Sequence, residues 1–184
     1  MPERLHIGAD GWVDGGRRHP SPNIDARPEG MPIDLIVLHN ISLPPAQSAV
    51  DFGTDHVLDL FTNTLDCDAH PYFDQLRGVR VSAHFFIRRT GECVQFASCD
   101  ARAWHAGASD FFGRTRCNDF SIGIEIEGTD DLPFTPEQYA TTASLVRAIC
   151  AAYPIAAIAG HSDIAPGRKT DPGPHFDWAH LRAL

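Results

Sequence analysis

Two histidines and an aspartate give the clearest chemical signal in this sequence. His39 ends the apolar run LIVLHN, and His161 and Asp171 lie much later, within GHSDIAPGRKTDPGP. Two imidazoles and a carboxylate can hold a zinc ion and leave its fourth position open to water, as in catalytic zinc sites. We therefore predict that His39, His161 and Asp171 bind one Zn²⁺ per chain.

A cation and a second carboxylate could complete a hydrolytic centre. Lys169 lies two residues before Asp171, so in an extended segment both side chains face the same way, and its ammonium could stabilise an oxyanion. Glu125 in DFSIGIEIEG is the candidate general base for activating a water molecule, with Glu127 on the same strand face as the alternative. Together these residues predict hydrolysis of an amide bond.

Each of these residues also has an ordinary structural interpretation. A single histidine is more often a core or surface residue than a ligand, and we expect His84 and His105 to be structural or to line a substrate site. Asp171 could simply begin a turn, and Glu125 could be a solvated residue of an alternating strand. Gly123 favours the functional interpretation of Glu125, because a missing side chain leaves room for a ligand or another backbone.

Apolar runs and turn residues predict the strands that must position these groups. Ile33–His39 is a continuous apolar run, as in a central strand covered on both faces. Ser82–Ile87 and Cys93–Ala97 flank a turn that contains Gly91, which predicts a β-hairpin. Asp119–Gly128 alternates between apolar and other residues and predicts a further strand, with the isoleucines on one face and Glu125 on the other.

Capping signals predict two helices. Residues 55–64 indicate a short helix, and a longer helix begins with Thr135 as N-cap, Pro136 as first residue and Gln138 completing a capping box. The apolar spacing of this longer helix predicts a buried stripe made of Tyr139, Ala143, Val146 and Cys150.

The order of these elements predicts one mixed α/β domain, with a central mixed sheet flanked by helices. His39 and His161 each directly follow an apolar strand, the second of them over residues 155–159. Functional groups of open α/β sheets gather at strand ends, so we expect the two histidines to meet. The domain should span residues 32–184, with residues 1–31 as an irregular arm packed on it.

Composition restricts the partners and the location. A net charge of −9 argues against nucleic acid and anionic membranes as partners. The five cysteines are odd in number and contain no C-x-x-C pair, so neither a disulfide framework nor a thiolate zinc site is expected. The sequence shows no secretory signal and no spanning segment, which predicts a cytoplasmic protein, and nothing in it suggests more than a monomer.

The sequence resembles the cytoplasmic 1,6-anhydro-N-acetylmuramyl-L-alanine amidases of Gram-negative bacteria. These belong to the family of type 2 N-acetylmuramoyl-L-alanine amidases and peptidoglycan recognition proteins. The resemblance runs in order through LIVLHNISLPP, RVSAH, RAWHAG, RCNDFSIGIEIEGTD and GHSDIAPGRKTDPGP. It implies the α/β fold of that family and assigns the same ligands, base and cation, namely His39, His161, Asp171, Glu125 and Lys169.

The resemblance also implies a substrate and a physiological role. The reaction would cleave the amide between the lactyl group of 1,6-anhydro-N-acetylmuramic acid and L-Ala of the stem peptide, in peptidoglycan recycling. Removing these small anhydromuropeptides would lower the signal that induces β-lactamase. Four residues match positions that line the substrate groove of the family, although the two arginines could also be ordinary surface charges: Asn40, Arg80, Trp104 and Arg116.

Two other functions stay open at this point. One is a lytic amidase that attacks polymeric peptidoglycan, against which the missing export signal argues. The other is a peptidoglycan-binding module without catalysis, against which the complete set of ligands together with Lys169 and Glu125 argues. Comparing the cleavage of soluble anhydromuropeptide with that of intact sacculi distinguishes a lytic amidase from the predicted recycling enzyme. The zinc content of the purified protein distinguishes a non-catalytic binding module from an enzyme.

Overall fold

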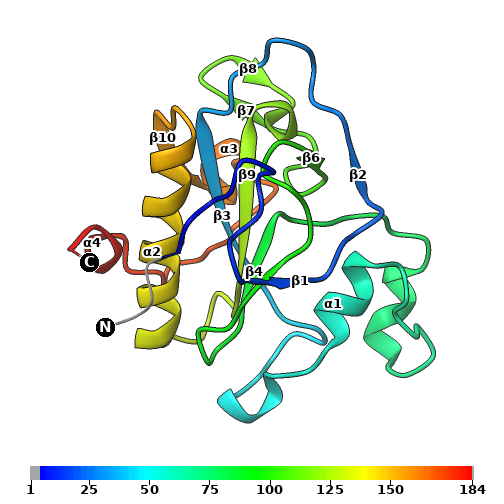
Figure 1. The fold of residues 1–184 in the computed structure, drawn as a ribbon. Helices are drawn as coiled ribbons and strands as arrows, with labels where there is room; N and C mark the ends of the chain where they lie inside the picture. Colours follow the sequence, from blue (N-terminus) through cyan, green and yellow to red (C-terminus); the bar gives the residue numbers. More distant parts are fainter. Residues whose placement is uncertain (1–4, 184) are drawn as a thin grey trace.

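A six-stranded mixed sheet forms the centre of the computed structural model, which describes residues 5–183 (Figure 1). Its strands follow the spatial order β1-β5-β4-β9-β3-β10. They are β1 (Arg17–Arg18), β5 (Cys93–Gln95), β4 (Phe85–Ile87), β9 (Ser121–Glu127), β3 (Leu35–Ile41) and β10 (Ala157–Gly160). Two small two-stranded sheets lie beside it, formed by β2 (Ile24–Asp25) with β6 (Arg102–Ala103) and β7 (Asp110–Phe111) with β8 (Arg114–Thr115).

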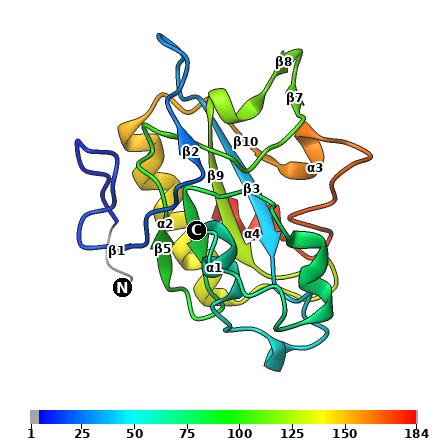
Figure 2. The same cartoon turned by 90° about the vertical axis from the view of Figure 1, so that its right-hand side faces the viewer.

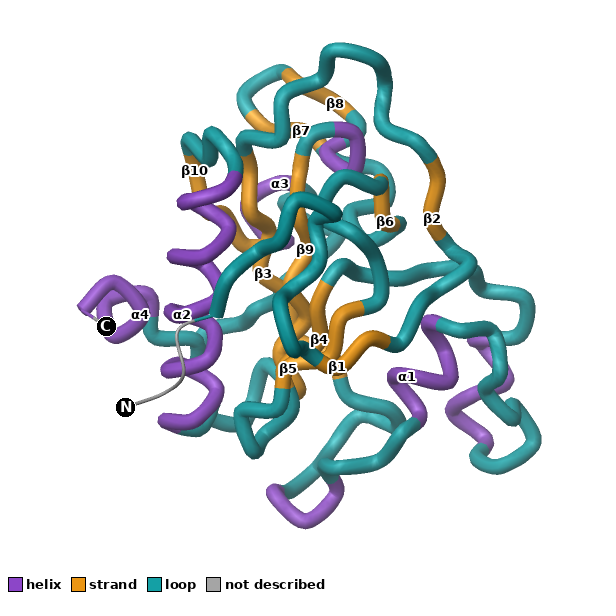
Figure 3. The backbone as a smooth tube through the Cα atoms, viewed as in Figure 1, coloured by secondary structure: helices purple, strands orange, loops and turns teal. Residues whose placement is uncertain are grey.

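Helices cover both sides of the central sheet, as Figures 1 and 2 show for α2 and α1. The α-helices are α1 (His56–Phe61), α2 (Pro136–Ala152), α3 (His161–Ile164) and α4 (Trp178–Ala183), and the 3₁₀ helices are η1 (Ala49–Asp51), η2 (Pro71–Leu76) and η3 (Cys117–Asp119). Much of the remaining chain forms loops around the sheet (Figure 3). The predicted mixed α/β fold with one central sheet is confirmed.

Four neighbouring strands of the sheet, β4, β9, β3 and β10, run parallel. β3 pairs with β9 on one side and with β10 on the other, and β4 also pairs with β9 in parallel. Only the hairpin of β4 and β5 is antiparallel within this sheet, as the turn at Gly91 predicted. Leu35 to Leu38 of β3 are fully buried, as expected for a parallel strand covered on both faces.

The two faces of the sheet pack against different clusters. The isoleucines of β9 contact the cluster that includes α2, represented by Ile122, Ile124 and Tyr139. Phe86 and Val94 of the hairpin pack on the opposite side, against α1 and η2. The alternation predicted for β9 is therefore real, although both of its faces are buried.

Helix α2 begins as predicted, and its predicted buried stripe is confirmed at Tyr139 and Ala143, with Val146 partly buried. Thr135 and Gln138 form the reciprocal capping box. The residues that are fully excluded from solvent are Thr142, Leu145 and Ile149, whereas Cys150 is exposed. The predicted stripe was wrong at Cys150, because the stripe facing the sheet is set by these three residues and leaves Cys150 at its solvent edge.

The N-terminal arm is tied to the sheet by strands and by buried polar groups. Within the described part of the arm, β1 pairs with β5 and β2 pairs with β6, so the arm is not wholly irregular. The buried Gln95 accepts a hydrogen bond from Val13 N at 2.7 Å and donates to Gly11 O at 2.9 Å. Backbone groups of the arm are thus satisfied by a side chain of the central sheet.

None of the helices within residues 5–183 has the length and apolar character needed to cross a bilayer. The five cysteines, all of which lie in this described range, carry free thiols.

A buried histidine holds the backbone of β9. His84 is fully excluded from solvent, its Nδ1 accepts a hydrogen bond from Gly123 N at 3.0 Å, and its Nε2 donates to Ala101 O at 3.0 Å. Burial, together with the nearby Arg27 charge, lowers the pKa of His84 to about 3. His84 is therefore neutral at any pH at which the protein would normally be handled.

Neutral His84 makes the fold acid-sensitive. Between the pKa of His84 in the folded state, about 3, and the histidine pKa of about 6.5 in the unfolded state, only the unfolded state binds a proton at this residue. The free energy of unfolding is therefore highest above about pH 6.5 and falls as the pH drops toward 3. The variant His84→Asn keeps an acceptor for Gly123 N but cannot bind this proton. We expect it to reduce the slope of the unfolding free energy against pH by ~1.4 kcal/mol per pH unit, the contribution of one proton. Urea denaturation between pH 6 and 4.5 measures both slopes, and equal slopes would contradict the assignment.

Candidate active site and metal centre

The parallel strands deliver the predicted ligands to one end of the sheet. His39 lies near the end of β3, and His161 follows β10 directly, as the first residue of α3. Since β10 pairs in parallel with β3, the two histidines leave the sheet side by side. The following loop returns to this place and is held there by a hydrogen bond from Ser162 N to Asp171 O at 2.9 Å.

Three ligand atoms converge at this point. His39 Nδ1 lies 2.9 Å from His161 Nδ1 and 3.0 Å from Asp171 Oδ2, and His161 Nδ1 lies 3.1 Å from the same oxygen. Tetrahedral zinc with bonds of 2.0–2.1 Å would need donor atoms about 3.3 Å apart, so only a small adjustment separates this triangle from a zinc site. These residues form a group that could hold a metal ion.

Burial sets the charges of this group. Desolvation lowers the pKa of His39 to about 4, although the hydrogen bond to Asp171 opposes it, so its imidazole is neutral and can act as a ligand. Desolvation alone would raise the pKa of Asp171, but hydrogen bonds with His161 and His39 bring it below its usual value. Two nearly buried imidazoles and an ionised carboxylate are a suitable donor set for a divalent cation.

Glu125, the predicted general base, lies beside this group. The register of β9 against β3 pairs Glu125 with His39, and Glu125 Oε1 lies 3.9 Å from His39 Nδ1. Its Oε2 is buried without a hydrogen-bond partner among the described residues. Burial raises the pKa of Glu125 well above its usual value, and Asp171 raises it further while Lys169 opposes the shift. A carboxyl group whose pKa is raised in this way is suited to accept a proton and return it.

Glu127, the alternative base, has a structural role instead. It is 3 % exposed, its Oε1 accepts a hydrogen bond from Gly53 N at 2.7 Å, and its Oε2 accepts one from Arg89 N at 2.9 Å. Both oxygens therefore hold backbone segments. Glu127 is also not among the described residues that line the cleft beside the ligand group.

A cleft of about 630 Å³ opens over this group. Glu125, His161 and Asp171 line it, and so does Lys169, which is exposed. The positive charge of Lys169 lowers the pKa values of both Glu125 and His39. Its charge therefore acts on the residues at the centre of the site.

Two of the four predicted binding residues line the cleft. Asn40 donates from Nδ2 to Asp130 Oδ1 at 2.7 Å and to Pro172 O at 3.0 Å, so its Oδ1 remains as an acceptor. Trp104 forms part of the wall, and its buried Nε1 has no hydrogen-bond partner among the described residues.

Arg80 and Arg116 lie elsewhere. Neither is among the described residues that line the cleft, and both are exposed. Arg116 adopts a left-handed backbone with φ of 60° and pairs with Asp119 at 3.3 Å. Their predicted contacts with substrate gain no support from these positions.

Two residues that line the cleft were not predicted as site residues, and a third, His105, was expected only to be structural or to line a substrate site. Tyr72 of η2 and Asp130 line the cleft, and His105 lies 2.9 Å from His39 through its Nδ1. The motif RAWHAG, which contains His105, was part of the resemblance and carried this signal. Asp130 likewise ends the motif RCNDFSIGIEIEGTD of the resemblance, whereas Tyr72, in the short helix η2, lies in none of the quoted motifs.

This arrangement is that of a candidate metal-dependent hydrolase, built at the carboxyl ends of parallel strands in a mixed α/β fold. The sequence pattern of the N-acetylmuramoyl-L-alanine amidases matches residues 29–174. The chain therefore belongs to the N-acetylmuramoyl-L-alanine amidase family, and is an amidase.

Individual relatives resemble nearly the whole chain. The chain is 54% identical over 176 residues to the 1,6-anhydro-N-acetylmuramyl-L-alanine amidase AmpD of Escherichia coli (strain K12), covering 95% of this chain and 94% of that protein. A crystal structure of a selenomethionine AmpD derivative matches with a TM-score of 0.90 at 54% identity, covering 95% of this chain and 96% of the other.

A more distant structure shows a related amidase with a bound substrate. It is the E. coli N-acetylmuramyl-L-alanine amidase AmiD in complex with anhydro-N-acetylmuramic acid-L-Ala-D-gamma-Glu-L-Lys. The match has 28% identity and a TM-score of 0.59, and it covers 98% of this chain and 65% of that chain.

The structural role of Glu127 can be tested by Glu127→Gln. A glutamine has one acceptor oxygen and would turn an amide group toward one of the two backbone N–H groups, so we expect a loss of about 1–3 kcal/mol in the free energy of unfolding. Chemical denaturation measures this loss, with Glu29→Gln in the exposed part of the arm as the matched control. A variant with unchanged stability and abolished amide hydrolysis would instead identify Glu127 as the base.

Proposed function

We propose that this protein is a zinc-dependent amidase that cleaves 1,6-anhydro-N-acetylmuramic acid from L-Ala of the stem peptide. The observation that carries the proposal is the convergence of His39, His161 and Asp171 beside Glu125, in a cleft of a chain that resembles such an amidase over almost its full length. The named substrate of that relative supplies the chemistry of the bond to be cleaved.

The donor set supports zinc as the metal. His39, His161 and Asp171 would hold it through two nitrogens and one oxygen, which leaves a position free. Zinc, when bound, supplies a Lewis acid that polarises the amide carbonyl and lowers the pKa of a water molecule.

Glu125 is proposed to move the protons of the reaction. Its raised pKa and its unpartnered Oε2 suit a carboxylate that takes a proton from the attacking water and returns it to the amine of L-Ala. Its place on the neighbouring strand puts Glu125 Oε1 3.9 Å from His39 Nδ1, next to the proposed metal ligands.

Lys169 and the cleft walls are proposed to hold the substrate and the oxyanion. The Lys169 ammonium, on the wall above Glu125, would stabilise the negative charge that develops on the lactyl carbonyl oxygen. Asn40 Oδ1 would accept a hydrogen bond from the muropeptide, and the indole of Trp104 offers an apolar surface to the anhydro sugar.

We further propose that the enzyme acts as a monomer in the cytoplasm. The cleft and all the groups named for the reaction belong to one chain, so no second copy is required. Five free thiols suit a reducing compartment.

Metal removal and ligand loss test the zinc centre. We expect purified protein to contain one zinc per chain and to release L-Ala-peptide from soluble anhydromuropeptide, and a chelator to abolish that release. His161→Ala should lose the metal, because it removes one of three donor atoms, whereas Lys169→Ala should keep it and lose turnover by ~10²–10³-fold. Metal analysis and mass spectrometry of the products give both results.

The outcomes of this experiment separate the alternatives. Lys169→Ala with near wild-type turnover would remove Lys169 from the mechanism. A protein without zinc would favour a binding module, and strong preference for intact sacculi over soluble anhydromuropeptide would favour a lytic enzyme.

Glu125→Gln tests the base. The substitution preserves shape but removes the proton acceptor, so we expect kcat to fall ~10²–10⁴-fold while the zinc content stays unchanged. Glu127→Gln is the matched control on the same strand face and should retain turnover in the folded protein. Equal losses in the two variants would show that the effect is not specific to position 125.

A further inference from the structure

The outer nitrogens of both proposed ligand histidines face one two-residue segment. His161 Nε2 donates to the carbonyl oxygen of Ala106 at 3.0 Å, and His39 Nε2 lies 2.9 Å from His105 Nδ1. His161 Nε2 must carry the hydrogen, because a carbonyl oxygen only accepts, and this leaves His161 Nδ1 free to bind a metal. The partner of His39 Nε2 is the imidazole of His105. Whether His105 Nδ1 can accept a hydrogen bond depends on which of its two nitrogens carries the hydrogen.

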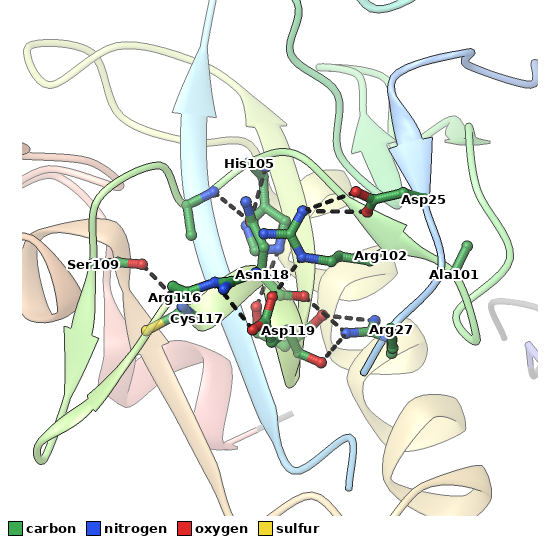
Figure 4. Close-up of polar contacts among 12 residues, drawn as sticks. Asp25, Arg27, Ala101, Arg102, His105, Ser109, Arg116, Cys117, Asn118 and Asp119 are labelled. Carbon is green, nitrogen blue, oxygen red and sulfur yellow. Dashed lines mark hydrogen bonds and ion pairs between the residues drawn. The ribbon is translucent and has the colours of Figure 1, made fainter. Parts of the chain in front are cut away.

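One side chain accepts hydrogen bonds from both backbone N–H groups of this segment, and Arg168 also donates to Ala106 O at 2.9 Å. Asn118 Oδ1 accepts hydrogen bonds from His105 N at 3.1 Å and from Ala106 N at 2.8 Å, and Asn118 itself is buried in η3 (Figure 4). Arg27 donates to the carbonyl oxygens of Asn118 and Asp119 at 3.0 and 3.2 Å. The backbone at His105 and Ala106 is thus fixed relative to β9, which follows η3 directly.

The His105 ring is fixed on its other sides by β9. Its Nε2 lies 3.2 Å from Ser121 Oγ, and Ser121 is fully buried. A Cβ atom added at Gly123 would lie 2.4 Å from His105 Cγ, so only a glycine at this position admits the ring. The space that Gly123 leaves on the face of Glu125 is therefore filled by His105 and not by a ligand.

We infer that His105 is a positioning residue that fixes the tautomer and orientation of His39. A neutral imidazole has one N–H and one lone pair, so a lone pair at His39 Nδ1 requires the hydrogen at Nε2. That buried N–H needs an acceptor, which His105 Nδ1 provides when its own hydrogen is on Nε2 and is donated to Ser121 Oγ. The inference rests on the proposed zinc centre, and it adds His105 and Ser121 to the residues that maintain it.

Zinc affinity with two matched substitutions tests this role. His105→Phe keeps a flat ring over Gly123 but removes the acceptor, and we expect zinc binding to weaken ~10- to 100-fold. His105→Asn keeps an acceptor oxygen near the position of Nδ1 and should restore affinity toward the wild-type value. Competition with a chromophoric chelator gives the dissociation constants, and His180→Phe, which alters a histidine that packs on Tyr139, should leave them unchanged.

Two further measurements keep the test decisive if His105→Phe does not fold. Gly123→Ala has no positive φ to forbid it and should displace the His105 ring, which weakens zinc binding without removing any ring nitrogen. In zinc-loaded wild-type protein, ¹⁵N spectra of the imidazoles should show neutral His105 with its hydrogen on Nε2.

Each result has a single meaning. Wild-type zinc affinity in His105→Phe or Gly123→Ala, or a His105 hydrogen on Nδ1 in the zinc-loaded protein, would overturn the inference. Failure of the wild-type protein to bind zinc would instead contradict the proposed function.

Discussion

The site depends on the parallel pairing of β3 with its two neighbours. This pairing puts Glu125 of β9 beside His39 and brings the end of β10, with His161, next to the end of β3. A slip of β9 by one residue would turn Glu125 to the face of α2 and bring an isoleucine to the ligand group. The dense apolar packing of the isoleucines against α2 opposes that slip, so core packing on one face specifies the chemistry on the other.

Burial gives this group its reactivity at a cost in stability. Desolvation keeps His39 neutral and raises the pKa of Glu125, while Asp171 stays ionised through its contacts with both histidines. Buried charges and unpartnered polar atoms are unfavourable, and Glu125 Oε2 is one of them. A divalent cation would compensate the charge of Asp171, so metal binding and folding stability are coupled in the same direction.

Local sequence signals predicted the elements, whereas long-range contacts decided the roles of individual residues. The apolar run ending at His39 and the capping box of α2 depend on neighbours in sequence, so both were predictable. Glu125 and Glu127 have equivalent local patterns, and they differ because Gly53 and Arg89, both distant in sequence, occupy the oxygens of Glu127. The open face at Gly123 was recognised, but only the fold shows that His105 fills it.

The described part of the N-terminal arm, from residue 5, supports the site without lining the cleft. Arg27 donates to Asn118 O, Cys99 O and Ser121 O, and burial lowers its pKa to about 10, so it remains charged at neutral pH. Asn118 in turn accepts hydrogen bonds from the backbone of His105 and Ala106, the segment that contacts His39 and His161. Arg27 and Asn118 therefore connect the arm to the ligand group. Carbonyl groups gathered around one buried guanidinium would lose their donors together if the arm detached. The arm is therefore part of the framework that positions the proposed metal ligands, although residues 32–184 supply every group proposed for the reaction.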